Sequence, residues 1–182
     1  PPRWQQRQNA TRLLEQLLTF TYPGTSRSWA RSHRASGAPY LERGDDPDPH
    51  LQVSVSHAGK WAAAAISTEA GVGADIEKVK PGRVTAELAK FMGWKLRDNA
   101  AADFYRRWTL WEAYTKCREG HLFALGGPEF EGLYASSDRC GDGSSRTWHG
   151  LHLQFAPNVH AAVVVRTLRP VVTAARALDV DQ

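Results

Sequence analysis

The sequence Gly71-Val-Gly-Ala-Asp-Ile-Glu-Lys-Val-Lys-Pro-Gly82 begins as an apolar strand and then places two acidic residues two positions apart. Successive side chains of an extended strand point to opposite faces, so Asp75 and Glu77 share one face while Ile76 takes the other. Two like charges side by side repel each other. A fold tolerates them only where a cation, a proton or open water relieves the repulsion.

Short apolar segments around this strand predict small antiparallel sheets. Turn-sized links join segments 51–57, 61–67 and 72–79, which is typical of an antiparallel meander. The polar segment that precedes them, rich in glycine and proline, predicts turns at residues 22–24, 36–39 and 43–49. Later in the chain, strands are expected at residues 130–134, 148–155 and 160–167.

Two long helices and one short helix are expected with these strands. Residues 3–20 carry apolar side chains at helical spacing, which predicts an amphipathic opening helix. Residues 103–119 give the strongest helical pattern, and residues 85–94 predict a shorter helix. Residues 57–66 echo residues 158–165, because each has a polar turn followed by a strand of small apolar residues. The echo predicts two similar halves that meet face to face near Gly71.

The composition suits a globular chain with a phosphate-bearing partner. Its 182 residues are 42% hydrophobic and 10% aromatic, enough for one compact domain or two small halves. The longest strongly apolar run, residues 61–66, is too short to span a membrane. Cys117 and Cys140 are the only two cysteines, and they lack metal-ligand spacing. Two cysteines do not indicate a disulfide framework, so a reducing cytoplasm is expected. The 23 basic and 19 acidic residues give a net charge of +4.

The long helix carries the next charged pair. Glu112 and Lys116 stand four residues apart and therefore lie on one face. An ordinary surface ion pair would explain them, but the aromatic residues around them indicate a largely buried helix. A third carboxylate beside Asp75 and Glu77 would complete an acidic cluster suited to a hard divalent cation. Magnesium prefers such carboxylates together with water and substrate phosphate, and Lys116 could hold a phosphate as a point charge.

Four short motifs occur along the chain in a recognisable order. They are Arg7 with Gly37-Ala-Pro39, Ser54-Val-Ser-His-Ala-Gly59, Gly73-Ala-Asp-Ile-Glu77 and Trp108-Thr-Leu-Trp-Glu-Ala-Tyr-Thr-Lys116. Together they resemble the motifs of the 4'-phosphopantetheinyl transferases of the surfactin-synthetase-activating (Sfp) type, over residues 5 to 165. Each motif alone is weak, and four in family order are specific.

The resemblance implies a fold and a reaction. The fold is α+β, with two pseudo-twofold-related halves, residues 1–70 and 71–182, each a small antiparallel sheet packed with a long helix. The reaction is the magnesium-dependent transfer of the 4'-phosphopantetheine arm of coenzyme A to a serine of an apo acyl, aryl or peptidyl carrier protein. Adenosine 3',5'-bisphosphate is released. The natural expectation is a cytoplasmic monomer without nucleic-acid or membrane partners.

The resemblance also implies roles for individual residues. Asp75, Glu77 and Glu112 would bind magnesium, with manganese as the alternative. Glu112, directly or through a water, would take the proton of the serine hydroxyl. Lys116 would contact the pyrophosphate and offset the charge that develops on the leaving group. The 3'-phosphate end of coenzyme A would be bound by Arg7, Ser56 and His57.

Two departures from the family pattern leave alternatives open. Trp111 stands where the family usually has a lysine, and Ala38 replaces the lysine of the Gly-Lys-Pro motif. A catalytically idle binding module descended from a transferase is therefore one alternative. A magnesium-dependent nuclease is another, since it also uses clustered carboxylates and suits a basic chain. His57 taken alone could be an ordinary turn histidine.

Overall fold

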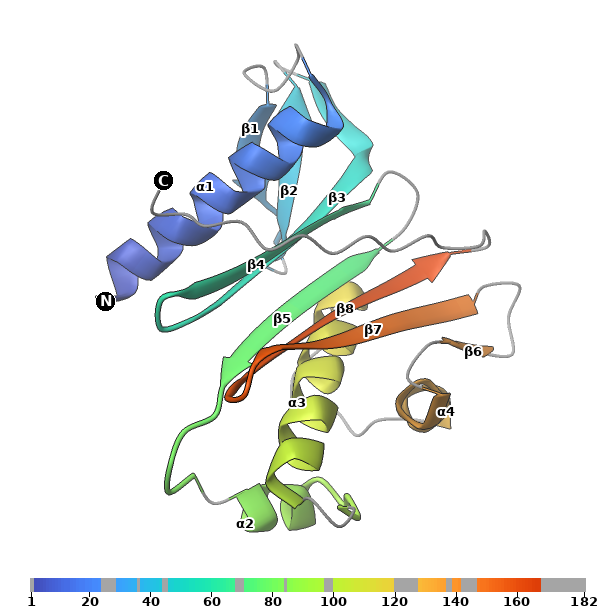
Figure 1. Cartoon of the computed structure of the whole chain (residues 1–182). Coiled ribbons are helices and arrows are strands. Elements are labelled where there is room, and N and C mark those ends of the chain that lie inside the picture. Colours follow the sequence, from blue (N-terminus) through green and yellow to red (C-terminus); the bar gives the residue numbers. More distant parts are fainter. Residues whose placement is uncertain are drawn as a thin grey trace.

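The chain forms two four-stranded antiparallel sheets with helices packed against them, an α+β arrangement (Figure 1). This confirms the expected α+β class with two small antiparallel sheets. The computed structural model describes residues 2–23, 29–35, 37–43, 46–67, 71–83, 85–96, 100–119, 128–136, 139–141 and 147–167.

The first sheet packs against the opening helix. Helix α1 (Arg3–Thr21) confirms the amphipathic helix expected at the start of the chain. The sheet has the order β1 (Trp29–His33), β2 (Pro39–Arg43), β3 (Asp46–Ala58) and β4 (Trp61–Ser67). Its core against α1 consists of Leu14, Leu18, Leu41, Leu51 and Val53.

Strands β1 and β2 occupy the polar segment for which only turns were predicted. They pair antiparallel from Trp29 opposite Arg43 to His33 opposite Pro39. Strand β1 is an edge strand, and its pattern of exposed and half-buried positions lacks the apolar alternation that reveals a strand in sequence. Strand β3 likewise begins at Asp46, so the predicted turn at residues 43–49 was wrong at its end.

The second sheet has the order β5 (Val72–Lys78), β8 (Val159–Thr167), β7 (Thr147–Ala156) and β6 (Arg139–Gly141). Strands β7 and β8 confirm the two strands predicted late in the chain. The predicted three-stranded meander was wrong in its last member, because β5 pairs with β8 and not with β4. The predicted turn-sized link made β4 the expected partner of β5. Strand β5 is instead buried over most of its length within the second sheet.

The described residues form three helices after β5. Helix α2 (Thr85–Phe91) ends before the predicted residue 94, because Gly93 adopts a φ of 68° and Trp94 N–H donates back to the Ala89 carbonyl. Helix α3 (Ala100–Cys117) is the long helix expected from sequence. None of the described helices combines the length and the apolar character needed to cross a membrane.

Helix α4 (Pro128–Ser136) corrects the strand predicted at residues 130–134. The buried side chains of Phe130, Leu133 and Tyr134 have helical spacing, but the run was too short to distinguish helix from strand by pattern. Proline at the first helical position and glutamates in the first turn favour the helix. Contact with the aromatic residues of α3 completes the burial of this face.

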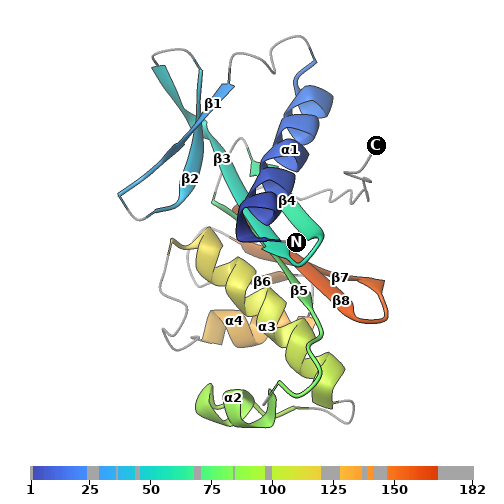
Figure 2. The same ribbon diagram turned by 90° about the vertical axis from the view of Figure 1, so that its left-hand side faces the viewer.

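The two sheets meet through strands of small residues. Helix α1 packs on the first sheet, and α3 packs on β5 and β8 of the second (Figure 2). On its other face β5 contacts β4, where Ala74 and Ile76 pack with Ala63. The Ala74 N–H donates to Ser54 Oγ of β3 at 2.9 Å. Strand β5 is thus held between α3 and the first sheet.

Candidate functional site

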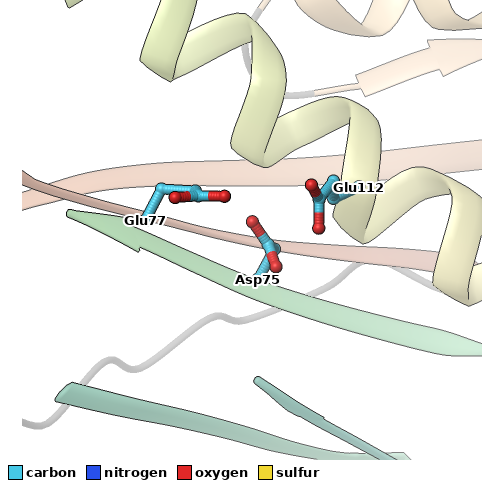
Figure 3. Close-up of side chains that lie close together, drawn as sticks. All are labelled: Asp75, Glu77 and Glu112. Carbon is cyan, nitrogen blue, oxygen red and sulfur yellow. The ribbon is translucent and has the colours of Figure 1, made fainter. Parts of the chain in front are cut away.

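Three carboxylates meet between β5 and α3. Asp75 and Glu77 come from β5 and Glu112 comes from α3, and one oxygen of each lies within 4.8 Å of the others. Figure 3 shows the three side chains directed into the same space between the strand and the helix. Asp75 is 2% exposed, whereas Glu77 and Glu112 are half-buried. The cluster therefore opens toward solvent on the glutamate side.

Gly73 on β5 and Gly71 just before it allow the helix to come this close. A Cβ built on Gly73 would lie 1.8 Å from the Ala113 carbonyl oxygen and 2.7 Å from the Cys117 nitrogen. A Cβ on Gly71 would lie 2.6 Å from the Cys117 carbonyl oxygen. Only glycine fits at either place, since the atoms it meets belong to the helix backbone. The glycine spacing thus brings Glu112 next to Asp75.

Gly73→Ala is expected to displace α3 from β5. Because the clash is with helix backbone, we expect a loss of at least about 3 kcal/mol in the free energy of unfolding. Gly59→Ala is the matched control, since its Cβ meets nothing within 4 Å and only its φ of 67° is strained. Urea unfolding of both variants measures the difference. Equal destabilisation of the two would contradict the close packing at Gly73.

Asp75 is the most constrained member of the cluster. Its Oδ1 accepts hydrogen bonds from Ser56 Oγ at 2.8 Å and from Lys116 Nζ at 2.7 Å. Lys116 also donates to the Ala74 carbonyl at 3.1 Å, so its ion pair is with the strand and not the Glu112 pair considered from sequence. Asp75 Oδ2 is buried and accepts no hydrogen bond from the described residues when Glu112 is ionised, whereas protonated Glu112 donates to Asp75. Such an acceptor typically costs about 1–3 kcal/mol unless a ligand or proton satisfies it.

The crowding changes the acidity of both glutamates. Burial raises the pKa of Glu112 to about 8, helped by the charge of Asp75 and opposed by that of Lys116. Burial also raises the pKa of Glu77, again helped by Asp75, while Arg83 opposes the shift. Arg83 Nη1 lies 3.4 Å from Glu77 Oε2. In the metal-free chain, Lys116, Arg83 and a proton on Glu112 together offset the three carboxylates.

The donor set fits a hard divalent cation. All three ligand groups are carboxylates, the type that magnesium and manganese prefer. Once Glu112 is ionised, the buried Asp75 Oδ2 has no donor among the described residues and is available as a ligand atom. A proton on Glu112 is what the cation would replace. Asp75, Glu77 and Glu112 therefore fit the cation expected from the sequence.

A pocket of about 540 Å³ adjoins the cluster. Lys116 belongs to both, because its side chain lines the pocket while its Nζ binds Asp75. Ser56 also belongs to both through its hydrogen bond to Asp75. Among the described residues, the lining contains cations and histidines and no carboxylate, so it suits an anion. The lining residues are Ala10, Arg31, His33, Val55, Ser56, His57 and Lys116.

The sequence analysis found part of this lining. Ser56 and His57 lie in the pocket, and Arg7 lies on α1 one turn before Ala10, but the Arg7 side chain is outside the described residues. Arg31 and His33 were missed because β1 was taken for a turn region. Arg31 Nη2 lies 3.3 Å from His33 Nε2, on the pocket side of β1. Their spacing of two residues would have placed them on one face had β1 been recognised.

Other polar and aromatic groups near the site are structural. Trp111 is buried against Tyr114 and Phe130, so the position that is a lysine in the family faces the core here. His160 is 2% exposed and lies 3.1 Å from His152, nitrogen to nitrogen. Burial lowers the pKa of both histidines, that of His152 to about 4. This pair is therefore neutral near pH 7.

No protein-family model matches this chain, and no curated protein shows significant similarity to it.

Proposed function

We propose that this protein transfers the 4'-phosphopantetheine arm of coenzyme A to a serine hydroxyl of an apo carrier protein. The supporting observation is the position of Lys116. It joins a cluster of three carboxylates, within 4.8 Å of one another, to a cationic pocket of about 540 Å³. A diphosphate needs both features, since a divalent cation and a protein cation share its charge. Coenzyme A offers that diphosphate and a further phosphate for the pocket.

The proposed reaction is a displacement at the phosphorus that carries the pantetheine arm. The serine oxygen forms a bond to that phosphorus, and the bond to the adenylate phosphate oxygen breaks. Adenosine 3',5'-bisphosphate leaves with the electron pair of that bond. Glu112, directly or through a water, accepts the serine proton. Because its pKa is about 8 without a metal, Glu112 must first lose its own proton to act as a base.

The protein's contribution is charge and position. Lys116 lies beside the cluster and would offset the charge that develops on the leaving phosphate. Ser56 and His57, at the end of β3, would bind the phosphate end of coenzyme A with Arg7. A bound magnesium or manganese ion would supply Lewis-acid stabilisation of the phosphate oxygens, held by Asp75, Glu77 and Glu112. The chain itself takes little part in making or breaking covalent bonds.

The two sheets also support separate roles for the two parts of the chain. We place the boundary at residues 1–70 and 71–182, since the first part supplies β3 and the second supplies β5 and α3. Each part has one four-stranded sheet and one long helix, which fits two halves related by a pseudo-twofold axis. In this arrangement the first half binds the phosphate end of coenzyme A. The second half binds the cation and holds the base.

Mass spectrometry of a carrier protein tests the proposal. Incubation with coenzyme A, magnesium and an apo carrier should add one phosphopantetheine group to the carrier, and EDTA should prevent the addition. Several acyl, aryl and peptidyl carriers are needed, because the partner is part of the question. No mass gain with any of them, together with cleavage of DNA or RNA, would replace the transferase with the nuclease alternative. No gain and no cleavage would favour the idle binding module.

A further inference from the structure

Arg83 is an additional cation at the acidic cluster that the sequence motifs do not include. Its Nη1 lies 3.4 Å from Glu77 Oε2, and the two side chains are only 19% and 15% exposed. Glu77 is thus paired with an arginine at the same time as it faces Asp75 and Glu112. The arginine pairs with Glu77, whereas Lys116 pairs with Asp75.

The Arg83 guanidinium is seated on aromatic rings of α3. Its Cζ lies 5.0 Å from the ring centre of Trp108, 5.6 Å from that of Tyr105 and 5.7 Å from that of Phe104. Contacts of this kind hold a cation through the negative face of each ring. The loop that carries it is also fixed, because the Arg83 N–H donates to the Lys80 carbonyl at 3.2 Å. Arg83 is therefore positioned by the fold and not by Glu77 alone.

A fixed cation at this distance affects any ion that enters the cluster. A divalent cation that binds Glu77 must either displace the arginine from the carboxylate or tolerate its charge a few ångströms away. In a partly buried site the repulsion between a divalent cation and the Arg83 guanidinium is large. It exceeds what the cation gains from finding the Glu77 carboxylate already oriented. A diphosphate ligand would reduce this repulsion, since arginine binds phosphate with two parallel N–H donors.

We propose that Arg83 is a resident counter-ion of Glu77 that a divalent cation must overcome, so that the cluster binds its metal weakly until an anionic substrate arrives. The inference rests on the proposed metal site and adds its regulation. Binding of the metal and binding of the diphosphate are then coupled, and each strengthens the other by the same factor. Without substrate, the charge of Arg83 keeps the metal site largely empty.

Titration calorimetry with Mg²⁺ alone tests the first part. Arg83→Met keeps the packing stem over the aromatic rings and removes the charge. We expect this variant to bind Mg²⁺ about ten-fold more tightly than the natural chain. Lys80→Met is the matched control, because Lys80 carries the same charge in the same loop but is exposed and acts on Glu77 less strongly than Arg83 does. It should change Mg²⁺ affinity by less than about two-fold.

Titration with coenzyme A present tests the coupling. In the natural chain coenzyme A should strengthen Mg²⁺ binding, and this strengthening should shrink in Arg83→Met. Unchanged or weaker Mg²⁺ binding by Arg83→Met, in a variant whose melting temperature shows that it is folded, would overturn the inference. So would an equal effect of Lys80→Met. A chain that binds no Mg²⁺ in either form overturns the inference and the metal site together, whereas tighter binding without transfer to any carrier overturns only the proposed function.

Discussion

Glu112→Gln is expected to reduce phosphopantetheine transfer by at least about 10³-fold while leaving the chain folded. The substitution keeps the size of the side chain and removes both the proton acceptor and one of the three carboxylates within 4.8 Å of each other. Folding should not suffer, because burial already favours the neutral acid at this position. The rate of mass gain of an apo carrier measures the loss.

Two comparisons make the result for Glu112 specific. Glu87→Gln changes an exposed glutamate of α2 and should keep the natural rate. Asp75→Asn should also abolish transfer, but at a cost of about 1–3 kcal/mol in stability, because Asp75 Oδ1 accepts from Ser56 and Lys116. If Glu112→Gln transfers phosphopantetheine at the natural rate, Glu112 is neither the proton acceptor nor a required metal ligand.

The free energy of unfolding of the metal-free chain is expected to fall as pH rises from about 7 to about 9. The pKa of Glu112 is raised from 4.5 to about 8 in the folded chain. Between these two values the folded chain binds a proton that the unfolded chain has lost. This stabilisation is fully present below the ordinary pKa and is lost as pH rises through the folded one. Glu77, whose pKa is also raised, acts in the same direction.

Among the described residues, Cys117 also acts at the alkaline end of this interval, because burial raises its pKa from 9.0 to about 12. His152 and His160 have lowered pKa values, so their effect on stability rises with pH and is complete once the ordinary value of 6.5 is passed. Thermal unfolding in EDTA over the interval should therefore show a decline that Glu112→Gln largely removes. Mg²⁺ added well above its weak substrate-free dissociation constant should restore stability at the alkaline end, since it binds the ionised cluster. The same decline in Glu112→Gln would contradict the assignment of the titrating group.

The sequence predicted those parts of the site that depend on local spacing. Strand periodicity placed Asp75 and Glu77 on one face, and helix periodicity placed Glu112 and Lys116 together. The close approach of α3 to β5 depends on glycines, and the sequence does not show which backbone packs against them. Gly73 must be glycine because the Ala113 carbonyl lies over it in the folded chain.

The parts that were missed depend on contacts between distant segments. The hydrogen bond of Ser56 to Asp75 was not expected, because β3 lies beside β5 without pairing with it and no local pattern indicates such a neighbour. Arg83 follows a turn and reaches back to Glu77 across aromatic rings of a later helix. The helix at residues 128–136 was predicted as a strand at 130–134 because its apolar run is short, although its proline and glutamates favour a helix locally. Contact with α3 completes its burial.

We propose that the three carboxylates bind a divalent cation against the diphosphate of coenzyme A. Phosphorus NMR relaxation with Mn²⁺ measures this contact, because a bound paramagnetic ion relaxes nearby phosphorus nuclei. We expect strong relaxation of both diphosphate nuclei with the natural chain, and a fall to the level of Mn²⁺ and coenzyme A alone with Asp75→Asn. Equal relaxation with the natural chain and with Asp75→Asn would contradict it.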